Sequence, residues 1–135
     1  MKALICNEFG STKNLTLEEV KSPEPGAGQV LIDIHAAGIN FPDVLTVQGK
    51  YQFKPSLPFT PGIEVSGVIK KVGKDVKMRK VGDEVISTLQ TGAFASEVVT
   101  SENSTFLKGN MSFEQAAGFA LTYGTSYYAL KQRAR

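Results

Sequence analysis

The chain has 135 residues, of which 41% are hydrophobic and 21% are charged, and its formal net charge is +2. This length suits one domain with its own core and is short for two, and so small a net charge predicts neither a nucleic acid nor a membrane surface as a partner. One cysteine excludes an internal disulfide framework, and without an apolar run of roughly 20 residues or a secretory leader we expect a cytoplasmic protein.

The N-terminal part predicts two strands. Residues 2–8 form the first, and after a turn cluster at 10–14 an apolar alternation resumes over residues 15–20. Cys6 lies in the first strand. No basic residue stands beside it in the sequence, so a small buried side chain is favoured over a nucleophile.

The clearest strand pattern covers residues 29–37 and follows a loop at 23–28. Alternation assigns Leu31, Asp33, His35 and Ala37 to one face and the apolar residues between them to the other. His35 is the one histidine of the chain, so it cannot belong to a cluster of histidine ligands. A surface histidine near Asp33 is therefore favoured over a catalytic or metal-binding one.

At Asn40 the extended pattern gives way to a short helix, predicted from Phe41 to Gln48 and stopped by Gly49. Asn40 is a good N-cap, because its side-chain oxygen can accept a free backbone N–H of the first turn, and Pro42 fits that turn. Two interpretations are open here. Asn40 is either only a cap or a polar site residue placed at a strand-to-helix junction.

Beyond a proline-containing loop, further short strands are expected at residues 63–72, 84–89 and 93–100, with turns at 73–75 and 82–83. Gly67 inside one of them indicates a bulge or a close backbone approach. Short strands with turns every 8–12 residues are typical of an all-β barrel or sandwich. Residues 70–80 carry six basic side chains, but Asp75 interrupts them and no aromatic residue is interleaved, so a solvated hairpin is favoured over a phosphate site.

The C-terminal part predicts two helices. Ser112 and Gln115 form a capping box for a helix over 113–120, and a second helix is expected from about Tyr123 to Arg133. An apolar face of this second helix is predicted to belong to the core rather than to contact a cofactor. That face consists of Tyr123, Tyr127, Leu130 and Ala134.

Several motifs, taken in their order and spacing, resemble the medium-chain dehydrogenase/reductase superfamily. They are AAGINFPD at 36–43, GKY at 49–51, LPFTPGIEVSG at 57–67, VGDEV at 81–85, GAFASE at 92–97, AA at 116–117 and LTYGT at 121–125. More narrowly they resemble its zinc-independent quinone oxidoreductase (zeta-crystallin-like) branch. The resemblance implies a mainly β protein with short helices (α+β), built as a GroES-like partly open β-barrel and ending in helices that would lead into a Rossmann domain. It divides the chain into a GroES-like catalytic domain, 1–120, and a connecting helix, 121–135, toward a nucleotide-binding domain absent from this chain.

The resemblance also implies hydride transfer from NADPH to a quinone or an electron-poor enone. Asn40 and Tyr51 would be the catalytic residues, and Asn40, Thr122 and Thr125 would bind the cofactor. Asn40 would hydrogen-bond near the nicotinamide ribose or the substrate oxygen. Many superfamily members hold a catalytic zinc through a cysteine at the position of Asn40 and a histidine at that of Ile63, and this chain has neither. We therefore expect no zinc and no other metal site.

No glycine-rich phosphate turn between a strand and a helix occurs in the chain. A ligand cleft between two domains would therefore have one wall here, and a homodimer would form through the missing domain. Two hypotheses follow: the catalytic-domain portion of a quinone or enone reductase, or a non-catalytic GroES-like binding or structural fragment. Whether the chain is a shortened product, a fragment or a natural short protein stays open. An aliphatic alcohol dehydrogenase is disfavoured, because both zinc-ligand positions differ.

Overall fold

The computed structural model describes residues 1–134 and contains two antiparallel sheets. The strands are β1 (Lys2–Ile5), β2 (Thr16–Glu19), β3 (Gln29–Gly38), β4 (Glu64–Val72), β5 (Glu84–Thr88), β6 (Glu97–Ser101) and β7 (Thr105–Leu107). The helices are α1 (Phe41–Val47), α2 (Phe113–Ala117) and α3 (Ala120–Tyr127), and α3 continues as a π-helical stretch over Tyr128–Arg133. Short 3₁₀ turns lie at Thr12–Asn14 and Glu102–Ser104.

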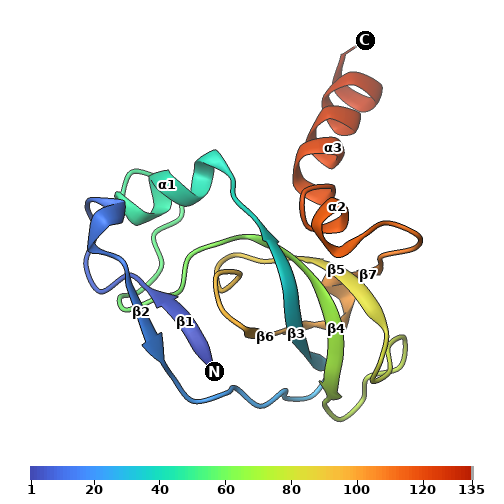
Figure 1. The fold of residues 1–135 in the computed structure, drawn as a ribbon. Helices are drawn as coiled ribbons and strands as arrows, with labels where there is room; N and C mark the ends of the chain where they lie inside the picture. Colours follow the sequence, from blue (N-terminus) through green and yellow to red (C-terminus); the bar gives the residue numbers. More distant parts are fainter. Residues whose placement is uncertain (135) are drawn as a thin grey trace.

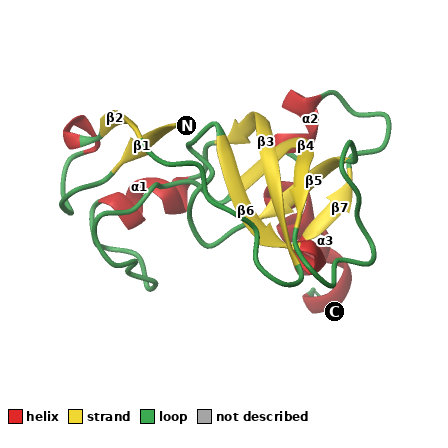
Figure 2. Ribbon diagram, turned by 90° about the horizontal axis from the view of Figure 1, so that it is seen from below, coloured by secondary structure: helices red, strands yellow, loops and turns green. Residues whose placement is uncertain are grey.

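The main sheet has the strand order β6-β3-β4-β5-β7 and curls into a partly open barrel (Figure 1). The two-stranded sheet of β1 and β2 lies beside it, together with α1 (Figure 2). The helix α3 projects away from the barrel (Figure 1). The expected mainly β architecture with a few short helices is confirmed.

The central strands β3 and β4 contribute most of the side chains of the core. A cluster of aliphatic side chains fills the barrel, formed by Val30, Ile32, Val65, Ile69, Val85, Ala93 and Val98. Burying one such Val or Ile side chain is worth roughly 1.5–3 kcal/mol. A smaller cluster of Cys6, Val47 and Phe59 holds α1 against the β1 side. The prediction of a buried Cys6 is confirmed, and burial raises the pKa of its thiol.

Two irregularities in β3 change the predicted alternation. The pairing of β3 with β4 shifts register between Leu31 and Ile32 and again between Ile34 and Ala36. Leu31 is buried like its neighbours Val30 and Ile32, so the face that it shares with Asp33 is less polar than predicted. Opposite Ile34 lies Gly67, where a Cβ atom would overlap the Asp33 carbonyl. The close backbone approach predicted at Gly67 is confirmed.

Several predicted boundaries are wrong. The first strand, expected over 2–8, ends at Ile5, and Cys6 makes only an isolated bridge to Phe59. The strand expected over 93–100 begins only at Glu97, because residues 93–96 form a loop in which the Phe94 N–H donates to the Pro61 carbonyl at 2.9 Å. The strand β7 was not predicted, since three residues are too few for a periodic pattern. The helix expected over 113–120 ends at Ala117, because Gly118 leaves helical geometry, and α3 starts at Ala120 rather than near Tyr123.

The apolar face of the last helix is not part of the core. Tyr123, Tyr127 and Leu130 are 66%, 62% and 73% exposed, so the core interpretation is wrong within the described chain. None of the residues of α3 is buried, because α3 projects from the barrel (Figure 1). Arg135, the end of the predicted connecting helix, lies outside the described residues. None of the helices described between residues 1 and 134 has the length and apolarity needed to cross a bilayer.

The basic segment at residues 70–80 lies among acidic partners on the surface. Ion pairs join Lys70 to Glu97, Lys71 to Glu24 and Lys80 to Asp83. The Arg79 guanidinium donates to the backbone carbonyl of Thr105 at 2.7 Å and so holds the loop against β7. These contacts agree with the solvated hairpin favoured from the sequence.

Candidate functional site

Hydrogen bonds to two acidic side chains hold Asn40 at the strand-to-helix junction. Asn40 is the N-cap residue of α1, with an extended backbone at φ −126° and ψ 156°, but its side chain makes no capping hydrogen bond, so the predicted contact of its oxygen with the first turn is wrong. Its backbone N–H donates to Asp43 Oδ2 at 2.7 Å. Its side-chain amide nitrogen donates to Glu64 Oε1 at 3.0 Å. Asn40 is thus bound to the first strand residue of β4 as well as to its own helix.

Glu64 is a buried carboxylate between the elements of this junction. It is 1% exposed, and its second oxygen, Oε2, accepts the Leu121 backbone N–H of α3 at 3.0 Å. In β3, Gly38 lies directly opposite Glu64. Glu64 is not among the site residues predicted from the sequence. The available signal was an acidic side chain at the start of a strand whose other members are mostly apolar.

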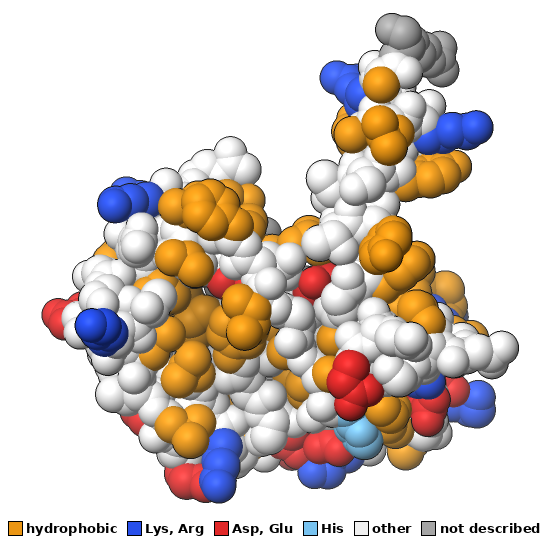
Figure 3. All heavy atoms as spheres, turned by 45° about the horizontal axis from the view of Figure 1, so that its top comes forward, with side chains coloured by type: hydrophobic (Ala, Val, Ile, Leu, Met, Phe, Trp, Pro, Cys, Tyr) orange, Lys and Arg blue, Asp and Glu red, His pale blue; other side chains and the backbone are white. Residues whose placement is uncertain are grey.

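An open cleft of about 520 Å³ lies between the α1 side of the molecule and α3. Its lining residues come from the start of α1, from the segment after α1 and from α3: Asn40, Phe41, Pro42, Tyr51, Leu121, Thr122, Thr125 and Ser126. Figure 3 shows the hollow between the body of the molecule and the projecting helix. All four residues predicted for the site, Asn40, Tyr51, Thr122 and Thr125, therefore lie on one cleft.

The cleft offers hydrogen-bonding groups on both walls and aromatic surface on one. Asn40 and Tyr51 line it on the α1 side, and Thr122 and Thr125 line it on the α3 side. The Thr122 hydroxyl donates to the Gly118 carbonyl at 2.8 Å, so its lone pairs are what it offers a ligand. Phe41 is 73% exposed. Such a lining suits a flat ligand that carries hydroxyl and amide groups.

A second carboxyl group lies behind Asn40. Asp43 is 3% exposed, and its Oδ1 atom has no hydrogen-bond partner among residues 1–134. Burial raises the pKa of Asp43, the hydrogen bond from Asn40 lowers it, and the neighbouring charge of Glu64 raises it further. The junction therefore concentrates two buried acidic groups beneath one wall of the cleft.

The other candidates from the sequence lie outside the cleft. His35 Nε2 is 3.4 Å from Asp33 Oδ2, and both side chains are about half exposed. The His35 ring also packs against the Phe113 ring, tilted by 35°, with 4.3 Å between centroids. This arrangement agrees with a surface histidine. Within the described part of the chain, no three His, Cys, Asp or Glu side chains lie close enough to hold a metal ion.

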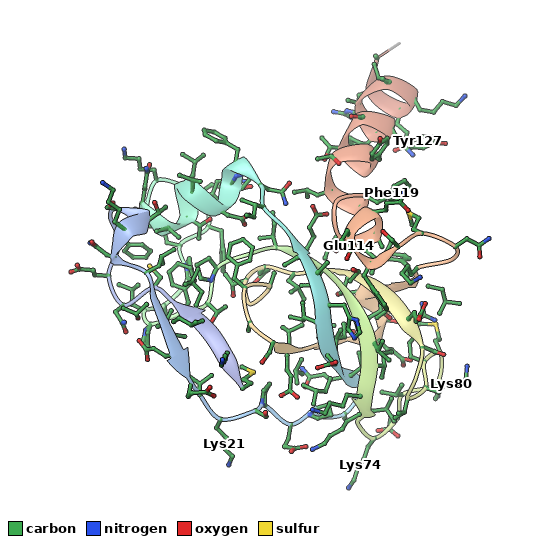
Figure 4. All side chains as sticks on the ribbon, in the orientation of Figure 1. Lys21, Lys74, Lys80, Glu114, Phe119 and Tyr127 are labelled. Atoms are coloured by element: carbon green, nitrogen blue, oxygen red, sulfur yellow. The ribbon has the colours of Figure 1, made fainter. Side chains whose placement is uncertain are left out.

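A second hollow, about 440 Å³ and almost wholly apolar, runs along α3 and the following π-helical stretch. Its lining includes Phe119, Tyr123, Tyr127 and Leu130. Figure 4 shows Phe119 and Tyr127 on the side of the helix turned away from α1. The helix thus presents hydroxyls to the cleft and an apolar face to the other side.

Comparisons with known proteins agree with this geometry. The family model described as the alcohol dehydrogenase GroES-like domain matches residues 26–130. The quinone oxidoreductase-like protein 2 homolog of Nematostella vectensis is 43% identical over 136 residues, which span 98% of this chain and 37% of the relative. The crystal structure of the human synaptic vesicle membrane protein VAT-1 homolog-like protein superposes with a TM-score of 0.96 at 33% identity, covering 99% of this chain and 44% of that one.

The structure of Escherichia coli quinone oxidoreductase complexed with NADPH superposes with a TM-score of 0.93 at 31% identity, covering 98% of this chain and 41% of that chain. In each case the chain spans less than half the length of the relative. Sequence and fold therefore agree, and the chain belongs to the alcohol dehydrogenase GroES-like domain family, among the quinone oxidoreductase-like members of the medium-chain dehydrogenase/reductase superfamily.

Proposed function

We propose that the chain forms the substrate-side wall of an NADPH-dependent reductase that transfers hydride to a quinone or an electron-poor enone. The observation that carries this proposal is the cleft itself. Four residues predicted from the sequence to form the site line this one hollow, although they come from two distant parts of the chain: Asn40, Tyr51, Thr122 and Thr125. One solved relative is a quinone oxidoreductase in complex with NADPH, which supports the same cofactor here.

The side chains present fit the nicotinamide end of such a cofactor. An amide and two hydroxyls suit the ribose and carboxamide groups, and an open cleft of about 520 Å³ admits a flat ring beside them. The phosphate end would need a glycine-rich turn, which this sequence lacks. When bound, NADPH supplies the hydride, and the protein supplies position and dipoles.

In this proposal each wall has its own task. Asn40, Thr122 and Thr125 would hold the nicotinamide end and so position it for reaction with the acceptor. Tyr51 lines the acceptor pocket, and its phenol can donate to the oxygen on which negative charge develops. Positions 40 and 63 carry neither thiolate nor imidazole, so we propose that the reaction uses no zinc. A quinone or enone delocalises the developing charge and needs only hydrogen bonds.

The division of the chain is part of the proposal. Residues 1–120 would form the catalytic domain, and residues 121–135 would connect it to a nucleotide-binding domain. The exposed apolar side of α3 supports this, because a second domain would bury it. A homodimer through that domain and a cytoplasmic location remain predictions.

A second candidate function is a non-catalytic binding or structural module. The apolar groove along α3 favours it, since this groove offers a contact surface that does not involve the cleft residues Asn40 and Tyr51. The two candidates differ in whether the chain responds to NADPH.

Titration of the chain with NADPH, followed by nicotinamide fluorescence with and without 1,4-benzoquinone, tests the proposal. We expect saturable binding, weakened about 5-fold in Thr125→Val, because one hydrogen bond contributes about 1 kcal/mol. The matched control Thr12→Val changes an exposed threonine on a distant 3₁₀ turn and should bind like the wild type. Absence of binding by the folded chain would favour the non-catalytic module.

A further inference from the structure

Glu64 connects the two walls of the cleft from below. Its Oε1 atom accepts a hydrogen bond from the side-chain amide of Asn40, which belongs to the α1 wall. Its Oε2 atom accepts one from the backbone N–H of Leu121, at the start of the α3 wall. Figure 1 shows α1 and α3 at the same end of the barrel, on either side of the end of β3. Glu64 is 1% exposed, so these protein donors replace the water that an acidic side chain normally binds.

The surroundings leave the Glu64 carboxylate little freedom. A Cβ atom at Gly38 would overlap both the Glu64 carboxylate and the Ala117 carbonyl, so the carboxylate lies directly on the β3 backbone. The β3–β4 pairing places Gly38 and Glu64 opposite each other. Both carboxylate oxygens of Glu64 accept hydrogen bonds, and the carboxylate also packs against the backbone at Gly38. Only one orientation of the Glu64 side chain satisfies all of these contacts.

The chemistry of the two donors explains why this residue is acidic. Asn40 Nδ2 and Leu121 N both donate, and a carboxylate accepts at both oxygens. Glutamine in the same place has one oxygen and one NH₂ group. It could accept from Leu121 only while presenting its NH₂ to Asn40, whose amide would then have to rotate by half a turn to offer its oxygen. The charge of Glu64 therefore determines which end of the Asn40 amide faces the protein and which end remains for the cleft.

We propose that Glu64 is the positioning residue of the cleft: it sets the orientation of the Asn40 amide and joins the α1 wall to the start of α3. The ligand part of this inference rests on the proposed NADPH site. The orientation of Asn40 does not, because it follows from hydrogen bonds within the chain. A residue with this role acts on the ligand only through Asn40 and α3.

Nuclear magnetic resonance of the chain labelled with ¹⁵N tests the orientation directly. The Asn40 side-chain NH₂ signals are assigned by their loss in Asn40→Ala, and they are then followed in Glu64→Gln. We expect both these signals and the Leu121 backbone amide to shift strongly. The matched control is Glu102→Gln, since Glu102 is also a buried carboxylate that accepts two backbone N–H groups, those of Lys77 and Met78, away from the cleft.

Glu102→Gln should lower the melting temperature as Glu64→Gln does, yet leave the Asn40 signals in place. Asn40 signals that stay unchanged in Glu64→Gln would overturn the proposal, because a purely structural Glu64 would affect stability alone. Glu64→Asp, with a shorter side chain and the same charge, should restore part of the wild-type Asn40 signals. No recovery in a folded Glu64→Asp variant would contradict the role given to the charge.

NADPH titration of the same variants tests the ligand part. We expect Glu64→Gln to raise the NADPH Kd at least about 5-fold, and the double variant Asn40→Ala/Glu64→Gln to bind more tightly than the product of the two single fold-changes predicts, because part of the Glu64 effect passes through Asn40. Additive effects would mean that Glu64 does not act through Asn40, which would overturn the positioning role. If the wild-type chain itself does not bind NADPH, the proposed function fails, while the resonance signals still decide whether Glu64 orients Asn40.

Discussion

Replacing Asn40 with alanine takes one hydrogen bond away from the buried Glu64 carboxylate. A hydrogen bond to a charged group contributes about 1.5–3 kcal/mol, and Glu64 is too well buried for bulk water to take over the contact fully. The cap of α1 is affected less, because its 2.7 Å hydrogen bond to Asp43 comes from the Asn40 backbone, which alanine keeps. We expect a loss of about 2 kcal/mol in the free energy of unfolding, more than the roughly 1 kcal/mol of a lost cap alone.

Urea unfolding of the wild type and the variant, monitored by circular dichroism, measures this difference. The matched control is Asn7→Ala, which removes an exposed asparagine whose amide donates to Thr16 and Glu18 on the surface. We expect the control to stay within about 0.5 kcal/mol of the wild type. An Asn40→Ala variant as stable as Asn7→Ala would refute the reasoning, since the buried carboxylate would then lose nothing with its partner.

Three further expectations follow from the packing and the charges. Gly38→Ala should destabilise the chain by about 2 kcal/mol in urea unfolding, because the added Cβ overlaps the Glu64 carboxylate; a loss below about 0.5 kcal/mol would contradict that contact. Cys6 should react with iodoacetamide at least about 100-fold more slowly in the folded chain than in urea, because burial raises the pKa of its thiol, and equal rates would show an accessible thiolate. The hydrogen bond from Lys70 lowers the pKa of Glu97, so this pair stabilises the fold above the unfolded pKa of about 4.3 and the effect is lost as the pH falls through the folded pKa. Glu97→Gln should accordingly be less stable than the wild type near about pH 7, the difference should shrink as the pH falls through the folded pKa of Glu97, and a constant difference would rule out this linkage.

Local sequence signals determined much of the fold. Asn40 with Pro42, and Ser112 with Gln115, identified two helix starts, because caps depend on residues within one turn. The turn residues and alternation located the long strands β3 and β4, whose length makes their period clear. The order and spacing of the motifs identified the family and, through it, the four cleft residues, including Tyr51 and Thr125, which lie far apart in the chain.

Only the tertiary structure decided the contacts between distant segments. The link from Asn40 to Glu64 spans 24 residues and that from Glu64 to Leu121 spans 57, and no local pattern encodes either. The exposed face of α3 was mistaken for core because helical spacing shows that a face is apolar and says nothing about what covers it. Sequence periodicity reports the faces of single elements. The partners of those faces depend on long-range packing, and the role of Glu64 as a buried link became visible only when the barrel brought three segments together.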